Sequence, residues 1–125
     1  LLAAVGATAW LDDERHMDAV TAVSGSGPAY VFYFIEALER AALEVNLPEE
    51  SARQLAVETF VGAVKLAAQS DEPSGTLRSR VTSRGGTTER ALNAMESDQV
   101  NDAIVRAIKA AAQRSRELGD EFGKD

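Results

Sequence analysis

The chain has no cysteine and only one histidine among its 125 residues. Without cysteine it forms no disulfide bonds, thiolate metal sites or cysteine nucleophile of its own. Because His16 is the only histidine, a histidine-based triad and a metal site with several histidine ligands are not expected. His16 lies between Arg15 and Met17 in a charged stretch. We expect His16 to be a solvated surface residue and the chain to bind no metal.

Long hydrophobic runs are also missing. The longest apolar run, Ala29–Ile35, is far too short for a bilayer, which requires about 20 apolar residues. No segment resembles a signal peptide. A hydrophobic content of 45% over this length is compatible with one packed domain. We therefore expect a cytoplasmic protein that has no membrane partner.

Acidic residues outnumber basic ones, but the charge is not evenly distributed along the chain. The formal net charge of −7 argues against a general nucleic-acid binder, because such proteins present a basic field. Residues 78–90 hold four arginines against Glu89 as the only acidic residue, which gives this segment a charge of +3. The segment is either a solvated face or part of a site for an anion.

Apolar residues recur at helical spacing along most of the chain, and no alternating strand pattern of useful length follows Leu11. The sequence predicts an all-α fold. Its first residues read as a helix end (Leu1–Gly6) and a short extended piece, so we expect a fragment of a longer protein. Helices are expected after a cap at Asp12 or Asp13, from Pro28 to about Asn46, from Pro48 to about Gln69, over 76–81, from Thr87 or Thr88 through Met95, and from a cap at Asp98 through Phe122.

The helix that follows Pro28 begins with seven apolar residues in a row, Ala29–Ile35. A helix that is apolar all round must be buried on several sides. The other helices of so small a domain cannot easily surround it, so we expect a second copy of the chain to cover it in a homodimer. Gly62, inside the next apolar stripe, predicts a close approach between helices there.

Two glycine-containing motifs invite a functional interpretation. The first, "GSGPAY" (Gly25–Tyr30), resembles part of a dinucleotide-binding loop, but it has no third glycine and no hydrophobic strand before it. It is better explained as an elbow between two helices, although its glycines could still allow a ligand to approach the backbone.

The second motif is "VTSRGGTTER" (Val81–Arg90). Two glycines allow positive φ angles, and the next helix offers unpaired N–H groups at its start. With the helix dipole and the hydroxyls of Ser83, Thr87 and Thr88, such a loop would bind a carboxylate or phosphate. The alternative is that Thr87 caps the helix and the glycines only make a turn. Residue chemistry alone leaves both interpretations open.

The two motifs also carry a family resemblance. "AVTAVSGSGPAYVFYFIEAL" (Ala19–Leu38), "LRSRVTSRGGTTERAL" (Leu77–Leu92) and the "RSRELG" ending (Arg114–Gly119) stand in this order. Together they resemble the C-terminal domain of pyrroline-5-carboxylate reductase, over about Leu1–Gly119. That family reduces 1-pyrroline-5-carboxylate to L-proline with NADPH or NADH, the last step of proline biosynthesis.

The resemblance implies an intertwined helical dimerisation domain of the 6-phosphogluconate-dehydrogenase C-terminal-like type, whose dimers often assemble into larger rings. Residues 13–125 would form this dimerisation and substrate-binding domain. Residues 1–12 would be the remnant of a connection from an N-terminal Rossmann domain absent from this chain. That missing domain would bind most of the cofactor, so no cofactor-binding residue is expected here, and the isolated chain is expected to be inactive.

The resemblance also assigns the residues of the loop. Ser83 and Thr88 would offer hydroxyls to the substrate carboxylate, while Gly85, Gly86 and Thr87 would bring backbone close to it. Thr88 matches a threonine proposed to hydrogen-bond the ring nitrogen, and is therefore our candidate catalytic residue. The family loop usually has proline where this chain has Arg84, a change that loosens the unbound loop and adds a cation beside an anion site.

Two other functions remain open from the sequence. The chain could be a structural helical oligomerisation module in which the glycine loop is only a turn. It could also be the helical domain of another Rossmann-type reductase that acts on a different small carboxylic acid.

Overall fold

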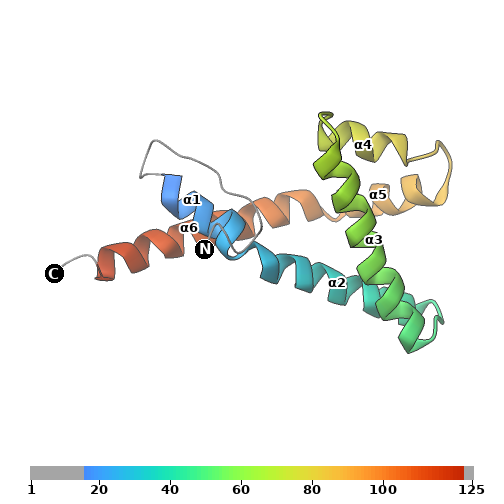
Figure 1. The fold of residues 1–125 in the computed structure, drawn as a ribbon, viewed down its shortest axis with the longest axis horizontal. Coiled ribbons are helices and arrows are strands. Elements are labelled where there is room, and N and C mark those ends of the chain that lie inside the picture. The colour runs from blue at the N-terminus through green and yellow to red at the C-terminus, as the bar shows by residue number, and fades with distance from the viewer. Residues whose placement is uncertain (1–15, 123–125) are drawn as a thin grey trace. The chain divides into compact units, whose positions relative to one another are not determined.

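The computed structural model describes residues 16–122 and contains helices with no strand in that range, which confirms the all-α prediction (Figure 1). The expected helix end and extended piece before Leu11, the cap at Asp12 or Asp13, and the connection over residues 1–12 lie outside the described residues. The helices are α1 (Met17–Val20), a π-helix η3 (Thr21–Gly25), α2 (Gly27–Glu44), α3 (Glu49–Gln69), α4 (Ser74–Arg80), α5 (Thr87–Ser97) and α6 (Val100–Phe122).

These helices belong to two compact units. The first contains α1, η3, the start of α2 and α6, and the second contains the rest of α2 with α3, α4 and α5. None of the helices between residues 16 and 122 is long and apolar enough to cross a membrane.

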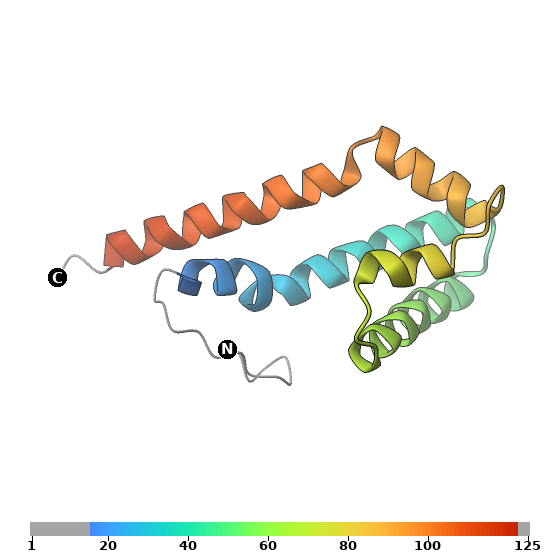
Figure 2. The same ribbon diagram turned by 90° about the horizontal axis from the view of Figure 1, so that it is seen from above.

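In the first unit, α1 and η3 lie against α6, a single uninterrupted helix in Figure 2. The Ser115 hydroxyl of α6 donates a hydrogen bond of 2.7 Å to the carboxylate of Asp18 in α1. Ala22 of η3 is buried, with only 1% of its surface exposed. The Asp18–Ser115 bond thus links α1 to α6.

The "GSGPAY" motif is an elbow between η3 and α2. The Ser26 N–H bonds the Thr21 carbonyl at 2.9 Å and closes the π-helix, and α2 begins at Gly27 with Pro28 in its first turn, as predicted. Tyr30 stands where a dinucleotide loop would need its third glycine, and its hydroxyl donates a 2.8 Å bond to the Ala22 carbonyl. These bonds support the structural interpretation of the motif.

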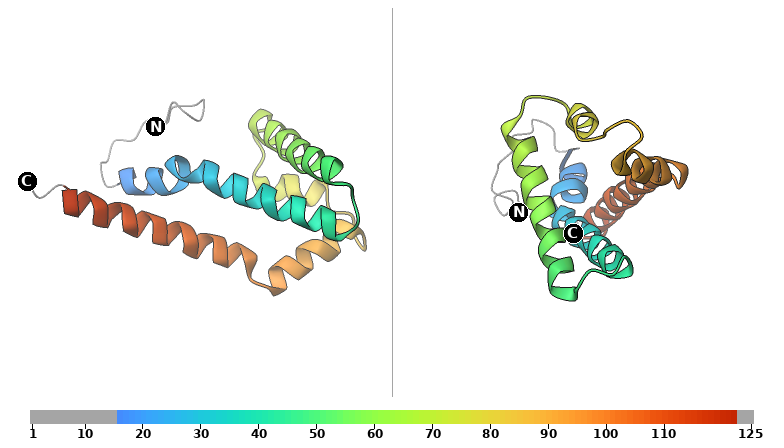
Figure 3. Two further views of the ribbon diagram at one scale, coloured as in Figure 1. Left: turned by 90° about the horizontal axis from the view of Figure 1, so that it is seen from below. Right: turned by 90° about the vertical axis from the view of Figure 1, so that its right-hand side faces the viewer.

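In the second unit, α2 and α3 meet through an edge-to-face contact of Phe34 and Phe60, whose ring centroids are 5.3 Å apart. Asn46 has a φ of 74° and ends α2, with the Leu47 N–H bonded to the Ala42 carbonyl. Figure 3 shows α3, α4 and α5 following one another through short connections. The helices expected from Pro48 to about Gln69 and from Thr87 are therefore confirmed.

Large side chains are poorly covered within the described chain. Its only buried hydrophobic residues are three alanines, Ala22, Ala52 and Ala56. Phe32 and Tyr33, in the apolar part of α2, are 65% and 77% exposed. Burial of a large apolar side chain stabilises a protein by about 1.5–3 kcal/mol, so these exposed residues favour association with another chain, as the sequence predicts.

A Cβ placed on Gly62 meets no atom of the described chain within 4 Å, so the close helix approach expected there is not made within one copy and stays a prediction for the dimer. One other expectation from the sequence is wrong in detail. Asp98 is the C-cap of α5 instead of the N-cap of α6, because the chain turns into α6 through Gln99, whose φ is 57°. Asparagine, aspartate and glycine are the usual residues in that conformation, so glutamine there gave no signal of the turn.

Candidate anion-binding site

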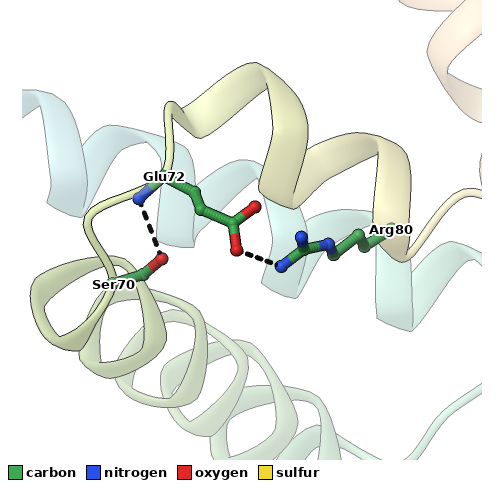
Figure 4. A network of polar contacts seen from close by, with 3 residues as sticks. All are labelled: Ser70, Glu72 and Arg80. Carbon is green, nitrogen blue, oxygen red and sulfur yellow. Dashed lines mark hydrogen bonds and ion pairs between the residues drawn. The ribbon is translucent and has the colours of Figure 1, made fainter.

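The candidate site lies in the second unit, where α4 leads into the glycine loop. An ion pair between Arg80, the last residue of α4, and Glu72, before its start, spans this helix (Figure 4). The Glu72 N–H in turn bonds the Ser70 hydroxyl at 3.1 Å. After α4, the Thr82 hydroxyl donates to the Arg78 carbonyl at 2.6 Å. Side-chain contacts therefore connect α4 to the residues just before it and just after it, where the loop begins.

Residues 83–86 form a β-turn. The Gly86 N–H donates to the Ser83 carbonyl at 3.0 Å, Gly85 has a φ of 75°, and Arg84 keeps a negative φ. A positive φ at the third residue alone is the pattern of a type II turn, which favours glycine there and often has proline before it. The turn therefore explains the glycine at position 85, and it would also accommodate the proline that the family resemblance implies in place of Arg84.

Gly86 is required for a different reason. A Cβ on Gly86 would lie 3.2 Å from the Ser83 carbonyl oxygen, the atom that closes the turn, whereas a Cβ on Gly85 would meet nothing within 4 Å. Position 85 therefore favours glycine because of its positive φ, and position 86 favours glycine because of the nearby Ser83 carbonyl oxygen. The loop has little freedom to accept a side chain at either position.

We predict that Arg84→Pro stabilises the protein by about 0.4–1 kcal/mol, because proline restricts the unfolded chain and is favoured at the second position of a type II turn. The N–H that proline removes has no acceptor among residues 16–122. Thermal unfolding measures the gain as a rise of a few degrees in Tm. Arg84→Ala is the control, since it removes the charge without fixing φ. A Tm no higher for the proline variant than for this control would contradict the prediction.

The start of α5 presents three free backbone donors. Gly86 is the N-cap and makes no side-chain cap bond, and the first intrahelical bond runs from Arg90 N–H to the Gly86 carbonyl. The N–H groups of Thr87, Thr88 and Glu89 have no acceptor within residues 16–122. Such donors, together with the positive end of the helix dipole, favour an anion at this position.

Hydroxyl groups surround these donors. Ser83, Thr87 and Thr88 are all exposed, and their hydroxyls make no hydrogen bond to other described residues. Thr87 is the first residue of α5 and does not cap this helix, which speaks against the alternative that Thr87 serves as the helix cap. The structure brings together all five residues that the sequence singled out: Ser83, Gly85, Gly86, Thr87 and Thr88.

The basic character of residues 78–90 is only partly neutralised. Arg80 is paired with Glu72, whereas Arg78, Arg84 and Arg90 have no carboxylate within 4.0 Å in the described part of the chain. The arrangement contains hydrogen-bond donors and cations but no acid–base pair. It can therefore bind and orient a carboxylate or phosphate, and it offers little to move protons beyond the threonine hydroxyls.

The sequence did not predict the position of Glu89. Its carboxylate accepts a hydrogen bond of 3.1 Å from the Gly85 N–H, so the side chain turns back toward the loop. Serine or threonine followed by glutamate three residues later is the usual signal for a glutamate that bonds backward at a helix start. Here Gly86 occupies the position of the serine or threonine, so the sequence does not show the usual pattern.

A shallow hollow of about 270 Å³ lies between α4 and α5. Arg78 and Glu89 contribute to its lining, but none of the five predicted site residues does. Among residues 16–122 no group of three or more His, Cys, Asp or Glu side chains could hold a metal ion. The loop itself is the better candidate for ligand binding.

Comparisons with known proteins agree on one family. The model of the family "Pyrroline-5-carboxylate reductase dimerisation" matches residues 14–118. The chain is 45% identical over 122 residues to pyrroline-5-carboxylate reductase 2 of Bacillus subtilis, covering 98% of this chain and 44% of that protein. It is 44% identical over 124 residues to pyrroline-5-carboxylate reductase of Pseudomonas aeruginosa, covering 99% and 45%.

Solved structures give the same result. A pyrroline-5-carboxylate reductase from Coxiella burnetii matches with a TM-score of 0.84 and 39% identity, over 87% of this chain and 40% of that one. The crystal structure of Plasmodium falciparum pyrroline carboxylate reductase with NADP bound matches with a TM-score of 0.82 and 36% identity, over 86% and 41%. The chain therefore spans less than half the length of the relatives it matches.

Proposed function

Because this chain belongs to the pyrroline-5-carboxylate reductase dimerisation family, we propose that it is the dimerisation and substrate-binding part of an enzyme that reduces 1-pyrroline-5-carboxylate to L-proline. The observation that carries the proposal is the set of free N–H groups at Thr87, Thr88 and Glu89. In this proposal the substrate carboxylate accepts these hydrogen bonds, and Ser83 adds a hydroxyl.

Thr88 has a second role in the proposal. Its exposed hydroxyl stands at the second residue of α5, beside the donors that would hold the carboxylate. From there we propose that it hydrogen-bonds the ring nitrogen of the substrate and helps to deliver the proton. Fixing both ends of a small ring orients its reacting carbon, which is the main task of a protein when a cofactor supplies the hydride.

The "GSGPAY" motif does not fit a dinucleotide-binding loop. "GSGPAY" forms a helix elbow in which the Tyr30 hydroxyl bonds the Ala22 carbonyl, and no strand precedes it among the described residues 16–24. The proposal therefore assigns most of the binding of the nicotinamide cofactor, NADPH or NADH, to a part of the protein outside the described residues. The Plasmodium falciparum relative was solved with NADP bound, which supports a nicotinamide cofactor for the full-length protein.

The proposal also includes a homodimer. The exposed apolar residues of α2 and the match to a dimerisation family both favour it. The family resemblance further implies that such dimers can assemble into larger rings.

A crystal of the full-length protein soaked with L-proline tests the substrate site. We expect ordered density with the proline carboxylate at the N–H groups of Thr87 and Thr88, because three unpaired donors converge at the start of α5. A carboxylate of similar size without a five-membered ring serves as the control for specificity. Absence of ordered ligand from this loop at saturating proline would favour a purely structural module instead.

A further inference from the structure

We infer that Glu89 is a positioning residue of the carboxylate site: its side chain holds the Gly85 amide and so fixes the turn that delivers the free donors of α5. This inference rests on the proposed function, since it concerns the same site. It starts from the 3.1 Å hydrogen bond between the Gly85 N–H and Glu89 Oε1.

The loop has five backbone N–H groups between Gly85 and Glu89, and the structure divides them into two sets. Gly85 donates to Glu89, and Gly86 donates to the Ser83 carbonyl at 3.0 Å. The N–H groups of Thr87, Thr88 and Glu89 find no acceptor within residues 16–122. Glu89 thus removes one donor from the loop and leaves three that belong to the first turn of one helix.

The bond also fixes an unusual backbone conformation. Gly85 has a φ of 75° and is exposed, so no packing contact holds it there. Glycine adopts either sign of φ with similar ease, and without a bond at its N–H the turn would depend on the Gly86–Ser83 bond alone. Glu89 is half-buried at the third position of α5 and ties the turn to the helix.

The same carboxylate has a cost for binding, because it places a negative charge near the site of an anionic substrate. Charge and hydrogen bonding can be separated by substitution. The Glu89→Gln variant would keep an oxygen that accepts from Gly85 but carry no charge, whereas Glu89→Ala would remove both. The inference therefore assigns the useful contribution to the acceptor and an opposing contribution to the charge.

Steady-state kinetics of the full-length protein test this assignment. We expect Glu89→Ala to raise the KM for pyrroline-5-carboxylate by about fivefold, the effect of losing one hydrogen bond of ordinary net strength, with kcat changed by less than about threefold. Glu89→Gln should give a KM at or below that of the unchanged protein. Glu89→Asp, which is one methylene shorter, should resemble the alanine variant. A KM for Glu89→Ala within twofold of the unchanged protein overturns the inference, and so does a Glu89→Gln variant as impaired as Glu89→Ala.

Amide hydrogen exchange at Gly85 provides a measurement that needs no substrate. We expect exchange about tenfold faster in Glu89→Ala than in Glu89→Gln, because only the latter retains an acceptor. Equal exchange rates in the two variants overturn the inference even if the kinetics cannot be measured.

The outcome also separates this inference from the proposed function. Thr88→Ala is assayed in parallel, since its effect does not depend on the Gly85–Glu89 bond. If Thr88→Ala is impaired and Glu89→Ala is not, only the role of Glu89 is wrong. If Thr88→Ala leaves the kinetics unchanged and proline does not bind the loop, the proposed substrate site is wrong.

Discussion

Replacing Thr88 with alanine in the full-length protein is expected to lower kcat/KM about 10- to 100-fold while the dimer stays intact. The hydroxyl of Thr88 is exposed and makes no hydrogen bond to the described residues, so its loss should cost little stability. In the proposed complex it bonds a ring nitrogen that gains a proton, and a hydrogen bond to a charged group contributes about 1.5–3 kcal/mol.

Two matched variants make this experiment decisive. Thr88→Ser keeps the hydroxyl and should recover most of the lost activity. Thr87→Ala alters the neighbouring threonine but keeps its backbone N–H, so its effect should be clearly smaller. Steady-state kinetics measure the loss, and sedimentation measures the dimer. Unchanged kinetics in Thr88→Ala would mean that this residue serves only the helix start.

Introducing a charge into the apolar part of α2 is expected to dissociate the dimer. Phe32 is 65% exposed in the chain, and in the proposed dimer the partner covers it. Phe32→Asp would lose about 2–3 kcal/mol of apolar burial and would bury a carboxylate without a partner. We expect the dissociation constant of the dimer to rise at least about 1,000-fold, which corresponds to about 4 kcal/mol.

Analytical ultracentrifugation over a range of concentrations measures this change. Arg40→Ala is the control on the same helix. Its side chain is 83% exposed and forms an ion pair with Glu44, and surface pairs at this spacing contribute little, about 0.3–0.5 kcal/mol. The control should remain dimeric. A Phe32→Asp variant that sediments as a dimer would show that this part of α2 lies outside the interface.

Several elements could be predicted because their signals are local. Pro28 and Pro48 stand at or next to helix starts, and Asn46 ends α2 in the left-handed conformation that asparagine tolerates. The stripe of apolar residues in α6 has a clear helical period. These features depend on a few neighbouring residues, so the printed sequence contains the information.

Other features depend on contacts that a single sequence does not reveal. The π-helix over Thr21–Gly25 is bonded by Tyr30, whose hydroxyl donates to a carbonyl eight residues before it in the chain. Thr87 could have capped α5, but the turn at Gly85 makes Gly86 the N-cap. Glu89 could have pointed to solvent or to the loop, and its charge alone did not distinguish the two.

Because only alanines are buried among the described residues, the folding of this chain is expected to depend on protein concentration. With no large side chain fully covered in the described residues, one copy has little apolar burial to offset the entropy of ordering so long a chain. Association then supplies much of the free energy of folding, and by mass action the midpoint of thermal unfolding rises with protein concentration. Dilution would consequently unfold the chain as it separates the subunits, and a stable folded monomer would not accumulate.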